Sequence, residues 1–112
     1  MSFEIRTIEV FDRQAKKLAK HYHSFREDFE AFLKELEKNP LMGDDLGNGI
    51  RKVRMAITSK GKGKRGGARV ITYTANLIIE MNEGEVVLLS IYDKSEQSTI
   101  TDKEIRLLKK QI

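Results

Sequence analysis

The spacing of apolar residues changes near residue 50, and this change limits the folds that the chain can adopt. In the first third, apolar side chains recur at helical intervals in two groups: Phe11, Ala15, Leu18 and Tyr22, then Phe25, Phe29, Phe32 and Leu36. Spacings of three and four residues place side chains on one face of a helix. From Ile50 onward the interval is two, as in a strand with one buried face. The pattern predicts two helices followed by a β-sheet.

Cap and turn residues indicate where the two helices begin and end. Ser24 with Glu27 three residues later has the pattern of a capping box, which satisfies free amide groups at a helix start. Asn39 precedes Pro40 and ends the second helix, because the residue before proline is disfavoured in helical conformation. We therefore expect a helical hairpin.

The remaining segments complete an α+β domain. Residues 3–6 alternate apolar and polar side chains as a short strand does, and three further strands are expected over 50–57, 67–81 and 86–92, with a turn at 82–85. Thr101 and Glu104 repeat the capping-box pattern before a closing helix. The predicted order is β-α-α-β-β-β-α over a single domain, 1–112, with two N-terminal helices and a C-terminal helix packed on one face of a small, mainly antiparallel sheet.

Composition excludes several classes of protein. The 112 residues suit one domain, and no apolar run approaches the roughly 18 residues of a membrane span. The chain has no cysteine and no signal-like N-terminus, so we expect a cytoplasmic protein. With two histidines, and with Asp44–Asp45 interpreted as part of a loop, we expect no metal and no small-molecule cofactor.

Positive charge is concentrated in the middle of the chain. The segment between Leu46 and Ile79 contains eight basic residues and no acidic one, out of 21 basic and 17 acidic residues in the whole chain. The remainder is therefore acidic on balance. A cationic segment on such a body is typical of a protein that binds a polyanion.

The glycine-rich loop TSKGKGKRGG, at 58–67, allows more than one interpretation. Gly61, Gly63 and Gly66 match the dinucleotide fingerprint, but that motif must join a strand to a helix, and here it joins two strands. One interpretation is a mobile, solvated hairpin tip. The other is a flexible rim that binds phosphates through four basic side chains: Lys60, Lys62, Lys64 and Arg65.

The flanking strands extend the positive charge into regular structure. Lys52 and Arg54 occupy the polar face of one strand, and Lys94 follows the last strand. Arg69 falls on the same side of its strand as Ile71 and Tyr73. We therefore expect it to join Lys52, Arg54 and Lys94 only if the start of the strand is twisted or bulged. Together they would form a basic floor for phosphate oxygens.

Tyr92 lies beside these residues in the sequence. An aromatic ring next to phosphate-binding cations is what a single-stranded nucleic-acid site uses to stack a base. A half-buried strand tyrosine is the alternative.

Three stretches resemble bacterial toxins of the RelE/ParE superfamily, particularly the RelE/HigB-like branch. They are RKVRMAI at 51–57, GGARVITY at 66–73 and LSIYDKSE at 89–96. The resemblance implies a RelE-like fold and a cognate antitoxin that holds the toxin inactive. It also implies metal-independent cleavage of mRNA on the ribosome, a stress response that inhibits translation.

By that resemblance the residues around the reacting phosphate are Lys52, Arg54, Arg69 and Lys94, with Lys52 as proton acceptor and Tyr92 stacking a base. The family's late tyrosine or histidine has no counterpart near Ile100 or at Gln111. Two alternatives remain: a ParE-like inhibitor of DNA gyrase, and an RNA-binding module of the same fold without catalysis.

Overall fold

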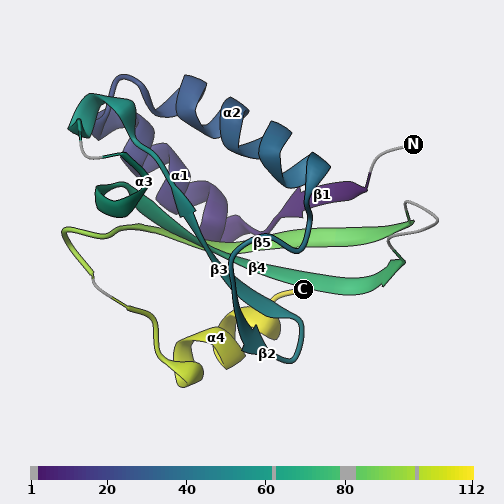
Figure 1. Ribbon diagram of the computed structural model, residues 1–112. Coiled ribbons are helices and arrows are strands. Elements are labelled where there is room, and N and C mark those ends of the chain that lie inside the picture. Colours follow the sequence, from purple (N-terminus) through teal and green to yellow (C-terminus); the bar gives the residue numbers. More distant parts are fainter. Residues whose placement is uncertain (1–2, 62, 79–82, 98) are drawn as a thin grey trace.

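A computed structural model of the chain describes residues 3–61, 63–78, 83–97 and 99–112 (Figure 1). Its elements are, in order, β1 (Glu4–Thr7), α1 (Glu9–His21), α2 (Phe25–Lys38), β2 (Asp44–Gly47), β3 (Ile50–Met55), η1 (Thr58–Lys60), α3 (Gly63–Gly66), β4 (Ala68–Ile78), β5 (Glu83–Asp93) and α4 (Asp102–Lys109). The α+β class and the order of the main elements are confirmed. The structure adds β2 and the two short helical turns, η1 and α3.

The strands form one five-stranded mixed sheet in the order β1-β5-β4-β3-β2. β1 runs parallel to β5, and every other neighbouring pair is antiparallel. The last strand, β5, thus lies beside the first strand, β1, which precedes the helical hairpin. The pairing of β1 with β5 ends at Leu88. Beyond this residue α1 covers the edge of β5, and the Gln14 side-chain oxygen accepts hydrogen bonds from Ile91 N and Ser90 Oγ.

Helices lie on both sides of the sheet. In Figure 1, α1 and α2 lie on one side of the β4–β5 ribbon and α4 on the other. The prediction that all helices share one face is wrong for α4. The reason is visible in β4, where the consecutive residues Val70 and Ile71 point to opposite faces and are both fully buried. Each face therefore needs a cover.

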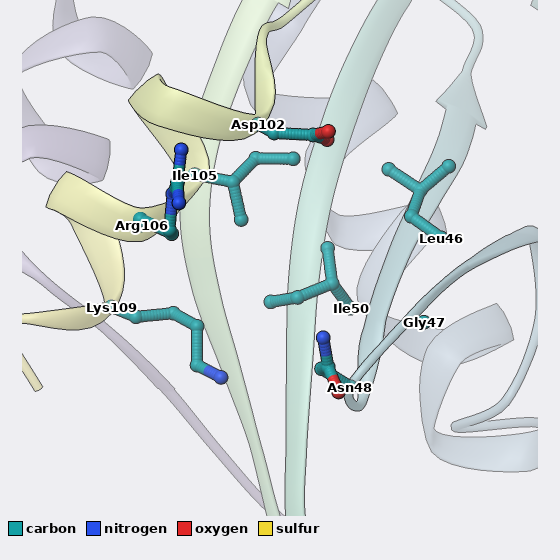
Figure 2. A pocket seen from close by; sticks show the side chains of 8 residues that line it. All are labelled: Leu46, Gly47, Asn48, Ile50, Asp102, Ile105, Arg106 and Lys109. Carbon is teal, nitrogen blue, oxygen red and sulfur yellow. The ribbon is translucent and has the colours of Figure 1, made fainter.

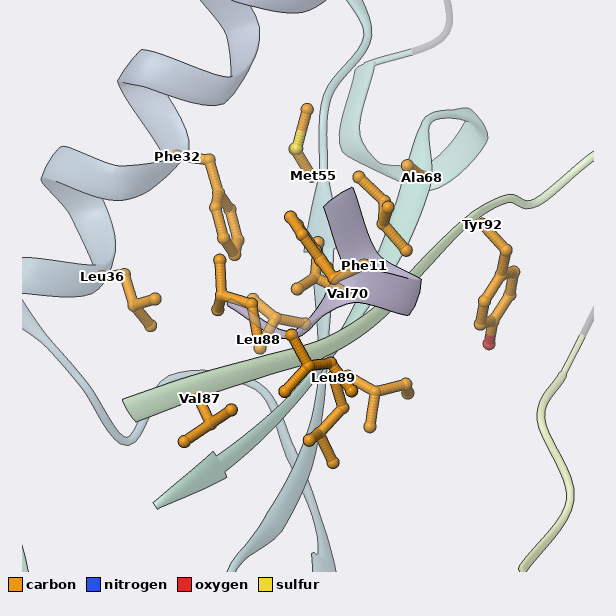
Figure 3. Close-up of a cluster of buried hydrophobic side chains, with 14 of the residues drawn as sticks. Phe11, Phe32, Leu36, Met55, Ala68, Val70, Val87, Leu88, Leu89 and Tyr92 are labelled. Carbon is orange, nitrogen blue, oxygen red and sulfur yellow. The ribbon is translucent and has the colours of Figure 1, made fainter. Parts of the chain in front are cut away.

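The main core lies between the helical hairpin and the sheet. Figure 3 shows Phe11 of α1 and Phe32 and Leu36 of α2 facing Met55 and Val70 of the sheet. These side chains are at most 2% exposed. The helical spacing read from the sequence thus corresponds to the buried faces of α1 and α2, and burial of this apolar surface is the main stabilising contribution to the fold.

The two predicted capping boxes have different outcomes. Thr101 Oγ1 accepts from Glu104 N, and the Glu104 carboxylate accepts from Thr101 N, so the box before α4 is confirmed. Ser24 makes no such bond. Its hydroxyl donates to Asp28 and accepts from Ser59 N, so a contact with η1 replaces the local cap.

Two predicted turns also need revision. Asp44 and Asp45 belong to β2, not to a loop, because they pair with Lys52 and Arg51 of β3. The predicted turn at 82–85 falls partly outside the described residues, and β5 already begins at Glu83.

Candidate nucleic-acid interface

Side chains from three strands form one row across the sheet. Arg54 of β3 lies directly opposite Arg69 of β4, and Arg69 lies directly opposite Tyr92 of β5. Directly opposed residues in antiparallel strands point to the same face, with Cα atoms about 4.5–5.5 Å apart. The sheet thus brings together residues separated by up to 38 positions in the sequence. We call Lys52, Arg54, Arg69 and Lys94 the basic cluster.

Arg69 joins this face without the predicted twist or bulge. Lys52 lies opposite Ile71, so Ile71 belongs to the same face as the basic residues. We expected Ile71 and Arg69 on the face of the sheet opposite to Lys52. That expectation was wrong because it assumed that only one face of the sheet carries buried apolar residues. α4 covers the far part of this face, where Lys109 Nζ lies 4.7 Å from the centre of the Tyr73 ring.

The guanidinium of Arg69 is buried and held by backbone carbonyls. Its side chain is 5% exposed, Nη1 donates to the oxygens of Lys64 and Ala68 at 3.1 Å, and Nη2 donates to Arg65 O at 3.0 Å. Burial lowers the pKa of Arg69, and the nearby Arg54 lowers it further. The turn of α3 supplies two of the three carbonyls, which is why the sequence alone could not place this side chain.

Lys94 is exposed at the end of the row. Its backbone N donates to Gly67 O at 3.1 Å, which ties the residue after β5 to the residue before β4. The pKa of the Lys94 ammonium is lowered chiefly by the positive charge of Arg69, with smaller contributions from desolvation and from the charges of Arg54, Arg65 and Lys52. A lysine with this property can act as a proton acceptor nearer to neutral pH than an ordinary one.

Tyr92 is buried, which does not fit a platform for base stacking. The residue is 6% exposed, and in Figure 3 its hydroxyl points away from Phe11 and Phe32. Burial raises the pKa of the Tyr92 phenol. Within the described residues, Oη has no hydrogen-bond partner. The hydroxyl is therefore a neutral donor close to Arg69.

Lys52 and Arg54 differ in their surroundings. Arg54 is exposed and faces solvent, whereas Lys52 is half-buried and lies opposite Asp44 of β2. The two side chains alternate with the buried Val53 and so point to the basic face, as predicted. The acidic neighbour was missed because Asp44 had been assigned to a loop.

The four basic residues predicted as a flexible rim have different positions. The Lys60 side chain is 8% exposed and its ammonium forms an ion pair of 2.5 Å with Asp93, so it is part of the interior rather than of a rim. Lys64 is exposed and pairs with Glu35 of α2 at 2.9 Å. Arg65 is exposed on α3. Lys62 lies outside the described residues.

A pocket of about 280 Å³ opens on the same face, toward the other end of β3 (Figure 2). It lies between α4 and the β2–β3 hairpin, with Ile50 and Ile105 on its apolar side and Arg106 and Lys109 on its basic side. Ile50 and Lys52 are two residues apart on β3, so their side chains point to the same face of the sheet. The pocket and the basic cluster therefore share one surface.

Comparison with known protein families agrees with this arrangement. The family model described as the RelE toxin of the RelE/RelB toxin-antitoxin system matches residues 8–111. The chain belongs to the RelE toxin family. This RelE-family chain therefore is a toxin of a toxin-antitoxin system, for which the family implies an antitoxin as partner. The resemblance noted from the three sequence stretches is confirmed at this level.

Among the described residues, no helix is long and apolar enough to cross a membrane. Over the same part of the chain, no three His, Asp or Glu side chains gather at distances suited to a metal ion.

Proposed function

We propose that the protein is a ribosome-dependent endoribonuclease that cleaves mRNA and thereby inhibits translation. The observation that carries this proposal is the exposed Lys94 whose pKa is lowered by the fixed charge of Arg69, next to the exposed Arg54. Cleavage of RNA without a metal needs a proton acceptor, charge stabilisation at phosphorus and a donor to the leaving oxygen. The basic cluster offers each of these.

In this mechanism Lys94 is the proton acceptor. Its neutral amine takes the proton of a ribose 2′-hydroxyl, and the 2′-oxygen forms a bond to the adjacent phosphorus. The bond from phosphorus to the 5′-oxygen then breaks, which leaves a 2′,3′-cyclic phosphate and a 5′-hydroxyl. The role expected for Lys52 thus passes to Lys94, because the lowered pKa is found at Lys94.

The other members of the basic cluster act on charge. Arg54 is exposed and can contact the phosphate oxygens directly. Arg69 is held by three carbonyls and acts through its field, by stabilising negative charge and by favouring the neutral form of Lys94. We assign proton donation to the leaving oxygen to Lys52. Lys64 and Arg65 would contact further phosphates of mRNA or ribosome.

The antitoxin is proposed to inhibit by covering this face. The basic cluster has a net positive charge, and an acidic segment of the partner would compete with RNA for it. Added salt should weaken the binding of this acidic segment to the basic cluster, as it weakens the binding of any polyanion, and this dependence on salt can be measured.

The test is cleavage of a defined message on a reconstituted ribosome, with 5′ ends mapped by primer extension. We expect cleavage at the codon in the A site, and a loss of at least about 100-fold in the Lys94→Ala variant. Lys34→Ala is the matched control, because Lys34 is an exposed lysine on α2. Intact message at excess protein would refute the proposal, and inhibition of DNA gyrase would then be assayed.

A further inference from the structure

A buried polar network lies directly behind the basic cluster. Asp93 is 2% exposed and stands between Tyr92 and Lys94. Because side chains alternate along β5, Asp93 points to the α1 face while its two neighbours point to the basic face. Its carboxylate accepts from Lys60 Nζ at 2.5 Å, from Tyr22 Oη, and from the N and Oγ of Ser95 at 2.9 and 2.7 Å.

The network joins three segments that are distant in the sequence. Tyr22 follows α1, Lys60 ends η1 and Asp93 ends β5. The Lys60 ammonium also lies 5.6 Å from the centre of the Tyr22 ring, a cation–π contact. Asp93 O accepts from the N of Glu96 and of Gln97, so the chain turns at this residue.

The charges of the pair compensate each other. Burial would raise the pKa of Asp93, but hydrogen bonds from Lys60, Tyr22 and Ser95 outweigh it and hold that pKa far below its ordinary value. The same carboxylate raises the pKa of the Tyr22 phenol. The network is therefore ionised and complete at neutral pH, with a donor for each oxygen of the carboxylate.

We infer that Lys60, Asp93 and Tyr22 are positioning residues that hold Lys94 beside the other members of the basic cluster. Lys94 has two attachments: its backbone N bonds to Gly67 O, and the preceding residue is anchored by the network. The turn of α3, whose carbonyls at Lys64 and Arg65 hold Arg69, stands between Lys60 and β4 in the sequence, so anchoring Lys60 also limits the movement of this turn. The expected effect of the network on the rate of cleavage rests on the proposed function. Its expected effect on the position of Lys94 rests on the fold alone.

Removing one partner would leave the other charge buried and unpaired, and such a variant can fail to fold. The test therefore uses the double variant Lys60→Met/Asp93→Asn, which removes both charges. The double variant leaves the net charge unchanged, and the positive charges that lower the pKa of Lys94, those of Arg69, Arg54, Arg65 and Lys52, all remain. A change in the pKa of Lys94 is therefore expected to come from a change in its position relative to these charges. Tyr22→Phe is a milder second variant, which removes one hydrogen bond.

The first readout is titration of the Lys94 side chain by NMR in the free protein, which does not depend on the proposed function. We expect the pKa of Lys94 to return toward the ordinary lysine value in the double variant, and by a smaller amount in Tyr22→Phe. An unchanged titration in a double variant that melts cooperatively would overturn the inference.

The second readout is the rate of message cleavage on the ribosome. We expect a fall of about 10- to 100-fold in the double variant, because a misplacement of about 1 Å can cost a factor of 10². Lys60→Arg, which keeps the charge, should recover most of the rate. Arg6→Gln is the matched control, because it breaks the partly exposed pair of Arg6 with Glu85 at the other end of β5.

The two readouts separate the two proposals. If wild type does not cleave but the titration of Lys94 moves, the proposed function fails and the positioning network stands. If wild type cleaves and both the titration and the rate are unchanged in the double variant, the network has no positioning role.

Discussion

Gly67 stands where the chain has no room for a side chain, immediately before β4. A Cβ added to it would lie 2.1 Å from Met55 O, 3.0 Å from Ile57 N and 3.1 Å from Ala56 Cα, whereas ordinary contact begins at 3.4 Å. All three are backbone atoms, one in the last residue of β3 and two in the residues that follow it, so no side chain can rotate out of the way. The Gly67→Ala variant must move one strand away from the other by roughly 1 Å.

The cost of this substitution follows from overpacking. Forcing atoms into a filled interior costs about 1–3 kcal/mol, and a backbone clash belongs at the upper end. We therefore expect a loss of about 3 kcal/mol in the free energy of unfolding, which corresponds to a fall of roughly 10–15 °C in Tm for a domain of this size. Urea denaturation followed by circular dichroism measures the first quantity, and a thermal melt measures the second.

Gly61→Ala is the matched control. Gly61 has a positive φ of 71°, and nothing lies within 4 Å of an added Cβ, so its substitution costs only the left-handed conformation, about 1 kcal/mol. Equal losses in the two variants would show that the close approach of β3 and β4 at Gly67 does not constrain the fold.

Three further outcomes are expected. The free energy of unfolding should fall as the pH drops below about 4, the ordinary aspartate value, toward the lower pKa of folded Asp93, because a group with a depressed pKa stabilises the fold only while it is ionised. Acid titration of unfolding should show a flatter profile in the double variant Lys60→Met/Asp93→Asn, which removes both charges of the pair. Thr101→Ala should cost about 1 kcal/mol through loss of the α4 cap, whereas an unchanged melt would contradict the capping geometry. Tyr92→Phe should raise stability by up to about 1 kcal/mol, because it removes a buried hydroxyl without a partner; a lower Tm would show that the hydroxyl is bonded.

Catalysis also has an expected dependence on pH. The rate of cleavage should rise with pH while Lys94 loses its proton and level off once it is neutral. Because the pKa of Lys94 is lowered from 10.5, the midpoint of this rise should lie below that pH. In an Arg69→Gln variant the midpoint should move to higher pH, and an unchanged profile would assign the proton acceptor to another group.

Local patterns predicted much of the fold. The apolar spacing placed α1 and α2 and their buried faces, and the β-branched runs placed β3, β4 and β5. The side of the sheet on which α4 packs was not predictable, since an apolar stripe does not say which surface it will cover. The parallel pairing of β1 with β5 was missed for a similar reason, because alternation has no direction.

The sequence predicted which basic residues gather on one face of the sheet, but not which of them are buried, paired or exposed. Lys52, Arg54 and Arg69 were identified because they lie in a stretch without acidic residues, and Lys94 because it follows the last strand. Asp93 was missed, although it stands inside the segment LSIYDKSE, because an acidic residue beside Lys94 looks like one more surface charge. A carboxylate in a run of apolar strand residues was the available signal, since it needs a buried partner.

The sequence by itself determined the class of fold, the order of the elements and the segment that carries the positive charge, because these depend on periodicity and composition over short stretches. Only the tertiary structure decided which of those charges is free. Lys60 meets Asp93 across 33 positions, and Tyr22 meets it across 71, so Lys60 is neutralised inside the fold. Lys94 has the opposite environment, because the sheet register places Arg69 and Arg54 beside it. Two lysines that look alike in the sequence differ because burial and charge depend on neighbours that only folding brings together.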